Sequence, residues 1–311
     1  MPKEPRARRP SPRRGGAIPK PPVHPLPPSA AERFRNADPY RAEREWVRYE
    51  GTPQRELWRE LRERFLQRHA VPATWVLDVG SGPGRFTGWL GSISSRRVAF
   101  DLSREMLRSA RAHGRPGEQG DVPPFDLVQG DGLLPPFPAG HFGQVAILGN
   151  TLGFAGASAD RLLEAAISLT APGGVLILEV APGPGERSRY LARLPASSVA
   201  RLMRAPVRAL VPRIEREGFD PMPFRKAEEG EFRRIPVEEL GRTFEERGWE
   251  VRETLAVAPA LGALASRIER VRGDPKAWAH LLEVEEEIGH EARRWTGAAA
   301  VLVAARARRA P

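Results

Sequence analysis

Apolar and polar positions along the chain alternate between two spacings, one typical of strands and one typical of helices. Short runs rich in β-branched and other apolar residues are separated by helical or turn-rich segments. These runs occupy residues 74–79, 97–101, 126–129, 144–149 and 174–180. Because strands that alternate with helices favour a layered α/β architecture, the pattern predicts a parallel, doubly wound sheet.

The segment before the first run, residues 30–69, has a helical pattern. Thr52 followed by Pro53 is typical of a helix N-cap and first turn. Four apolar residues then recur at the spacing of one helix face: Leu57, Trp58, Leu61 and Phe65. The pattern predicts a helix that covers the sheet.

The rhythm of strands and helices is interrupted after the fifth run. Residues 181–234 are rich in Pro, Arg and Gly, and we predict that they form an insertion. Within this stretch, residues 187–234 carry twelve Lys or Arg and six acidic residues among scattered apolar positions, which predicts basic, amphipathic helices. A helix at 236–247, a strand at 249–257, further helices and a last strand at 298–305 follow.

The composition restricts the chemistry that the chain can perform. Its 311 residues, 41% of them hydrophobic, suffice for one large α/β domain with an insertion. It has no Cys, which excludes disulfides, thiolate metal sites, iron–sulfur clusters and cysteine nucleophiles, and we predict no bound metal. No run of about 18 apolar residues and no signal-peptide apolar region occur, so we predict a soluble, cytoplasmic protein without a membrane partner.

Much of the net charge of +10 lies at the N-terminus. Residues 1–28 contain seven Lys or Arg, one Glu and ten Pro. Because proline removes backbone donors and few apolar residues are available to pack, this stretch is predicted to be a disordered tail, followed by one domain at 30–311. Two interpretations of the tail stay open: an electrostatic arm for RNA or another polyanion, and a solubilising extension.

The most informative motif lies at residues 75–87, where an apolar strand runs into three alternate glycines and then a helix. A dinucleotide-binding fingerprint would need Gly or Ala in place of Arg85, because its third small residue permits tight helix packing. The motif also places Asp78 inside the strand, where a nicotinamide-binding fold usually continues apolar. The segment from Asp78 to Gly84 resembles the glycine-rich first motif of class I S-adenosylmethionine-dependent methyltransferases.

The resemblance extends to two acidic signatures. Asp101, 17 residues after Gly84, resembles the family's acidic residue at the end of the second strand, which holds the ribose hydroxyls. A carboxylate suits this task because it accepts from two vicinal hydroxyls at once. Asp131, within residues 128–137, resembles the acidic residue beside the adenine amino group, and Met106 resembles an apolar residue packed near the adenine.

Further along the chain, Asn150 follows Gly149 and resembles a Gly-Asn pair that lies beside the methionine moiety in several small-molecule methyltransferases. The order of the C-terminal elements resembles the family's reversed seventh strand. The implied fold is therefore a seven-stranded, mostly parallel, doubly wound sheet with a reversed last strand. The implied donor-binding residues are Asp78, Gly80, Ser81, Gly82, Gly84, Asp101, Leu102, Met106, Asp131, Gly132 and Asn150.

Each of these residues also has a structural interpretation. Asp101 and Asp131 could be helix N-cap or turn carboxylates, because Asp favours such positions. Asn150 could cap the next helix, and Met106 could belong to the core. The joint order of the motifs favours the functional interpretation.

The resemblance implies S-adenosylmethionine as cofactor and methyl transfer by in-line displacement. We predict N- or O-methylation of a small-molecule acceptor, with the insertion as a lid that selects it. Three titratable residues are candidates for a catalytic base: Glu179, Tyr190 and His141. Each has a structural alternative: Glu179 as a paired carboxylate, Tyr190 as insertion core and His141 as an exposed loop residue.

Two other functions stay open. An RNA or ribosomal methyltransferase is suggested by the basic tail and insertion, with RNA as the partner. The absence of Cys excludes methylation at carbon 5 of pyrimidines, and no Asn-Pro-Pro-aromatic motif for exocyclic amines is present. The third hypothesis is a regulatory protein that binds the donor without turnover.

Overall fold

The computed structural model describes residues 39–72, 75–90, 96–113, 125–181, 233–257, 271–291 and 300–307. The predicted tail at 1–28 and nearly all of the predicted insertion at 181–234 lie outside the described residues. The tail, the insertion and the single domain at 30–311 therefore stay predictions.

Seven strands form one sheet in the order β3-β2-β1-β4-β5-β7-β6. The strands are β1 (Val76–Val79), β2 (Arg97–Asp101), β3 (Asp126–Gln129), β4 (Phe142–Ile147), β5 (Thr170–Val180), β6 (Trp249–Val257) and β7 (Ala300–Ala307). Neighbouring strands from β3 to β5 pair in parallel, whereas β7 is antiparallel to both β5 and β6. The predicted mostly parallel, seven-stranded sheet with a reversed last strand is confirmed.

Helices connect and cover these strands. They are α2 (Pro39–Trp46), η1 (Val47–Tyr49), α3 (Pro53–Arg68), α4 (Arg85–Trp89), α5 (Arg104–His113), α6 (Thr151–Phe154), η3 (Gly156–Ser158), α7 (Ala159–Leu169), α10 (Val237–Glu246) and α12 (Pro275–Glu291). Helix α3 begins as predicted, because the Thr52 side chain accepts a hydrogen bond from the Arg55 amide at 3.3 Å. Its predicted apolar face is fully buried at Leu57, Leu61 and Phe65.

Four strands differ in extent from the sequence prediction, and the first of them, β1, begins at Val76 rather than at residue 74. β4 covers 142–147 rather than 144–149, and β5 begins at Thr170 rather than at residue 174. The extension of β5 arises because Thr170 pairs with Phe142 before a shift in register, where the regular pairing of β4 with β5 begins at Gln144. β7 ends two residues later than predicted, at Ala307.

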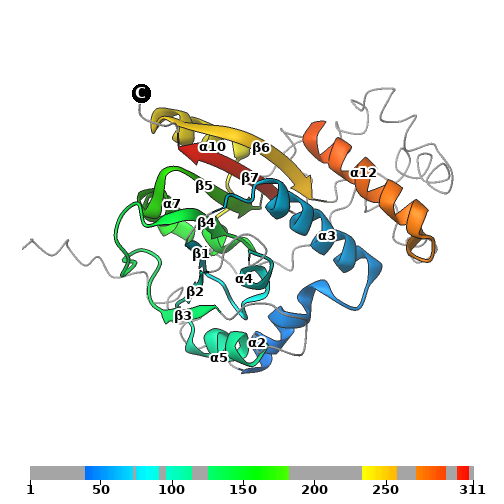
Figure 1. Cartoon of the computed structure of the whole chain (residues 1–311), viewed down its shortest axis with the longest axis horizontal. Helices are drawn as coiled ribbons and strands as arrows, with labels where there is room; N and C mark the ends of the chain where they lie inside the picture. The colour runs from blue at the N-terminus through cyan, green and yellow to red at the C-terminus, as the bar shows by residue number, and fades with distance from the viewer. Residues whose placement is uncertain are drawn as a thin grey trace, which may run out of the picture.

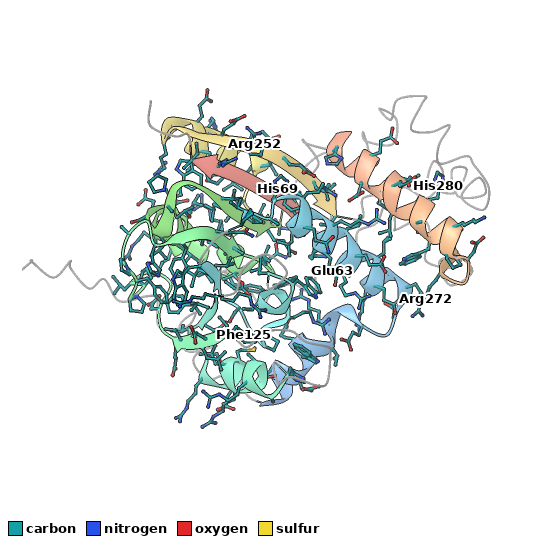
Figure 2. All side chains as sticks on the ribbon, viewed as in Figure 1. Glu63, His69, Phe125, Arg252, Arg272 and His280 are labelled. Carbon is teal, nitrogen blue, oxygen red and sulfur yellow. The ribbon has the colours of Figure 1, made fainter. Side chains whose placement is uncertain are left out.

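Helices cover both faces of the sheet, with α3 and α12 on one face and α7 and α10 on the other (Figure 1). An ion-pair cluster joins α3, α12 and β6. Glu253 of β6 contacts Arg68 at 2.8 Å, His69 at 2.6 Å and His290 at 2.7 Å, and Figure 2 shows His69 at the end of α3. None of the helices in the described part of the chain has the length and apolar character needed to span a membrane.

Candidate functional site

The loop after β1 contains the three alternate glycines, and each adopts a left-handed backbone conformation. Gly80, Gly82 and Gly84 have φ values of 69°, 55° and 82°. A Cβ at Gly80 would collide with the side chain of Thr151, whereas a Cβ at Gly82 would meet no atom within 4 Å. Gly82 therefore borders open space, and the loop forms a cradle in which a ligand can approach the backbone closely.

Asp101 at the end of β2 faces this cradle and is only half-buried. Its Oδ2 accepts a hydrogen bond from the Gly82 amide at 2.8 Å, and its Oδ1 accepts one from the Ser103 amide at 2.7 Å. Burial raises the pKa of Asp101 above its ordinary value, although these amide donors oppose the shift. Because each carboxylate oxygen has a second lone pair, Asp101 can still accept hydrogen bonds from a ligand.

Asp131 follows β3, on the far side of Asp101 from the glycine loop. Its Oδ1 accepts a hydrogen bond from the Leu133 amide at 3.0 Å, which is the turn contact that the structural interpretation predicts. Met106 of α5 is buried and packs against Ala42 of α2. These contacts agree with the structural interpretation of Asp131 and Met106. They do not exclude donor binding, because both residues also line the pocket described next.

One pocket runs across the carboxyl ends of β1 to β4, with an empty volume of about 1320 Å³ including space open to solvent. Loops after adjacent parallel strands meet at this edge of a sheet, where α/β proteins bind ligands. The pocket brings together eight residues predicted to bind the donor: Gly80, Ser81, Gly82, Asp101, Leu102, Met106, Asp131 and Gly132. Residues separated by about fifty positions in the sequence thus share one cavity.

Three other predicted donor-binding residues lie behind the wall of this pocket: Asp78, Gly84 and Asn150. Asp78 is fully buried in β1, and its Oδ2 accepts a hydrogen bond from the Thr87 hydroxyl of α4 at 2.5 Å. Burial, together with the nearby Asp101, outweighs the Thr87 hydrogen bonds and raises the pKa of Asp78 to about 7. The side chain ties β1 to α4 and so orients the glycine loop between them.

The raised pKa of Asp78 leads to a prediction about stability and pH. Between about pH 4 and 7 the folded chain keeps a proton that the unfolded chain has released, so the free energy of unfolding falls as pH rises through this window. The loss from this group amounts to about 4 kcal/mol at most. Urea unfolding from pH 4 to 8 should show that Asp78→Asn lacks this part of the decline, whereas Asp126→Asn, at an exposed position, keeps it. Parallel curves for Asp78→Asn and the wild type would contradict the prediction.

Asn150 is the single non-glycine residue with positive φ, 63°, in the part of the chain that the structure describes. It occupies the N-cap position of α6, but its side chain makes no capping hydrogen bond. Its Oδ1 is buried with no hydrogen-bond partner in the structure. The strained turn at Gly149 and Asn150 instead brings the neighbouring Gly149 and Thr151 to the pocket.

Glu179 near the end of β5 is one of the three candidates for a catalytic base, and it is fully buried. Its carboxylate accepts hydrogen bonds from Arg62 Nε at 3.0 Å and Arg62 Nη2 at 2.6 Å, and from the Gly149 amide at 3.2 Å. Burial alone would raise the pKa of Glu179, but Arg62 and the Gly149 amide outweigh it and hold the pKa below its ordinary value. The structure thus gives Glu179 the paired, structural role that was its alternative interpretation.

Of the other two candidates, His141 does not reach the pocket. His141 is exposed and precedes β4, so it lies at the amino end of that strand, opposite the edge that forms the pocket. Its ring packs against Trp75 at a centroid distance of 5.5 Å. Tyr190 lies outside the described residues.

Sequence reasoning missed the pocket wall that comes from the N-terminal helices. Glu45 of α2, Arg48 of η1 and Arg85 of α4 line the pocket. Apolar side chains complete the wall near Gly149: Phe86, Leu148, Phe154 and Ala155. Glu45 and Arg48 are spaced like any ion pair on a helix surface, so their spacing gave no signal of a site.

The sheet order, the glycine cradle and the carboxylates after β2 and β3 define a Rossmann-like α/β protein with a ligand-sized pocket at the carboxyl edge of its sheet. Residues 76–174 match the family model described as "Methyltransferase domain". This region carries the motifs given above, so residues 76–174 belong to a methyltransferase domain. Its cofactor is S-adenosylmethionine, and the open cradle at Gly82 beside Asp101 fits such a ligand.

Individual proteins resemble either a short part of the chain or most of it at low sequence identity. The chain is 38% identical over 73 residues to "Ribosomal RNA small subunit methyltransferase A" of Synechococcus sp. (strain JA-2-3B'a(2-13)), which is 24% of each protein's length. A chain of the complex that contains the Haloferax volcanii Trm112 methyltransferase activator is 17% identical, with a TM-score of 0.48 over 82% of this chain and 91% of that chain. An S-adenosylmethionine-dependent methyltransferase from Mesorhizobium loti is 18% identical, with a TM-score of 0.46 over 83% of this chain and 99% of that chain.

Proposed function

We propose that this protein transfers a methyl group from S-adenosylmethionine to a nitrogen or oxygen atom of a small-molecule acceptor by in-line displacement. The observation that carries the proposal is a single pocket with two kinds of wall. One wall combines the glycine cradle with Asp101 and Asp131, and the other is apolar, with Phe86, Leu148, Phe154 and Ala155. The polar wall suits a nucleoside donor, and the apolar wall leaves room for a compact acceptor.

We assign the donor-binding roles that the family resemblance implies, and the positions of the side chains support them. Asp101 holds the ribose hydroxyls with its remaining lone pairs, and Asp131 lies beside the adenine with Met106 against the ring. Gly82 lets the donor approach the backbone of the loop. Asp78 does not touch the donor. It accepts a hydrogen bond from Thr87 and so holds α4 against β1, which orients the loop between them.

The donor, when bound, supplies a methyl group already activated by the adjacent sulfonium. The chain then has to align the acceptor and exclude water, and positioning alone can supply several kcal/mol, about ten at most. Phe86 and Leu148 are buried apolar side chains that keep water from this part of the pocket. We assign no proton transfer to Glu179, because it is fully buried, does not line the pocket and is paired with Arg62.

RNA is the second candidate acceptor, and two observations favour it. Residues 1–28 hold seven Lys or Arg, and the local similarity over 73 residues is to a ribosomal RNA methyltransferase. An RNA-binding function requires affinity that falls steeply with salt concentration and with deletion of residues 1–28.

The test of both functions is transfer of a labelled methyl group from S-adenosylmethionine into a cell extract that is then separated into small-molecule, RNA and protein fractions. We expect label in the small-molecule fraction with the wild type and none with Asp101→Ala. Label in RNA alone would replace the small-molecule proposal by the second candidate. Donor binding without label in any fraction would indicate a protein that binds the donor without turnover.

A further inference from the structure

The α2–η1 segment supplies two charged side chains, Glu45 and Arg48, to the pocket wall. Arg48 Nη1 contacts Glu45 Oε2 at 3.0 Å, and both side chains remain partly exposed. On an open helix surface such a pair contributes little to stability. Its position in the wall of the donor pocket suggests a different task.

The α2–η1 segment is anchored to α4 and α5. Trp46 stacks on His113 of α5 with a centroid distance of 3.9 Å and an interplanar angle of 7°. The Arg85 guanidinium of α4 lies 4.9 Å from the Trp46 ring centroid and contacts Glu50 at 2.8 Å. These contacts lie on both sides of Arg48 in sequence, so they hold it in place relative to the pocket.

The charges in the pocket are separated along the sheet edge. Asp101 and Asp131 follow β2 and β3, at one end of the pocket. Arg48 belongs to η1, which contacts α3, and Arg62 of α3 pairs with Glu179 of β5, whose Oε2 also accepts a hydrogen bond from the Gly149 amide. The pocket thus presents two carboxylates after β2 and β3, and a carboxylate paired with a guanidinium from the α2–η1 segment.

S-adenosylmethionine has a matching division, with a nucleoside at one end and an amino-acid group, carrying one carboxylate and one ammonium, at the other. We propose that Arg48 binds the donor carboxylate and that Glu45 binds the donor ammonium. Guanidinium–carboxylate contacts are among the stronger and more geometrically specific hydrogen bonds in proteins. This inference rests on the proposed use of S-adenosylmethionine as donor.

The test compares two ligands that differ in the amino-acid group. S-adenosylhomocysteine carries it, whereas 5′-methylthioadenosine lacks it but keeps the nucleoside. By isothermal titration calorimetry, Arg48→Gln should weaken S-adenosylhomocysteine binding by about 10-fold or more and leave 5′-methylthioadenosine binding within about twofold. Arg48→Lys, which keeps the charge but not the planar fork, should recover part of the affinity.

The matched control is Arg44→Gln, an exposed arginine of the adjoining helix α2 outside the pocket, and it should bind both ligands like the wild type. Equal weakening of both ligands by Arg48→Gln would overturn the proposal, because it would indicate displacement of α2 rather than loss of one contact. Unchanged S-adenosylhomocysteine binding would overturn it as well. If the wild type bound neither ligand, the proposed donor itself would be wrong, which is a separate outcome.

Discussion

Replacing Arg62 by alanine is expected to lower the free energy of unfolding by about 3–5 kcal/mol, because it leaves a buried carboxylate without its counter-charge. Arg62 and Glu179 are 4% and 1% exposed, and their contact has two hydrogen bonds, at 3.0 and 2.6 Å. A third, from Arg62 Nη1 to the Trp58 carbonyl at 2.9 Å, is lost in the same variant. Urea unfolding at neutral pH measures the change.

Two comparisons separate the buried pair from a general effect of losing an arginine on α3. Arg59→Ala removes a half-exposed arginine of the same helix, paired with Glu63 at 3.8 Å, and should cost no more than about 1 kcal/mol. The double variant Arg62→Met, Glu179→Leu removes both charges and should recover most of the stability lost by Arg62→Ala. A loss for Arg62→Ala as small as that for Arg59→Ala would show that Glu179 does not depend on this partner.

The same pair shows where sequence reasoning reaches its limit. The position of Glu179 at the end of the fifth strand follows from the apolar run before it, and that position made it a candidate base. Its partner lies 117 positions away in α3, on a helix whose apolar spacing indicates only which face is covered. The charge on the buried side of that helix has no sequence signal, because an arginine there looks like an arginine on a solvated face.

Much of the fold follows from local patterns. The strand positions were predicted because apolar β-rich runs alternate with helices, and Thr52 marked the start of α3 because it supplies the capping oxygen. The extra residues of β5 were missed because Thr170 enters the sheet by pairing with Phe142, a contact set by the register of the neighbouring strand. Tertiary pairing of this kind leaves no trace in the apolar pattern of either segment.

The candidate site also has a part that the sequence predicted and a part that it did not. Asp101 and Asp131 were found because each follows a strand in a motif of fixed order, and the fold places both at one edge of the sheet. Glu45 and Arg48 were missed because their place in the pocket depends on how α2 packs on α5, through contacts such as Trp46 with His113. The carboxylates after β2 and β3 are therefore encoded in local motifs, whereas the wall that contains Glu45 and Arg48 is encoded by helix packing.

Asp101→Ala is expected to weaken binding of S-adenosylhomocysteine by about 100- to 1000-fold, because two charge-assisted hydrogen bonds to the ribose hydroxyls are lost. The variant also frees the amides of Gly82 and Ser103, which the carboxylate holds at 2.8 and 2.7 Å, so the glycine cradle loses support. Binding of 5′-methylthioadenosine should fall by a similar factor, since that ligand keeps the ribose. This result would contrast with Arg48→Gln, which is expected to distinguish the two ligands.

A more conservative variant separates loss of ribose contacts from loss of loop order. Asp101→Asn keeps a side-chain oxygen for one of the two backbone amides and places an NH2 donor against the other. We therefore expect a smaller loss of stability than in Asp101→Ala, with weaker binding of both ligands. Asp126→Asn, at an exposed position in β3 outside the pocket, should leave both affinities unchanged. Affinities of Asp101→Ala within about threefold of the wild type would contradict the ribose role. The acidic residue after β2 would then act mainly as a partner of the Gly82 and Ser103 amides, and the nucleoside would have to be held by Asp131 and the loop alone.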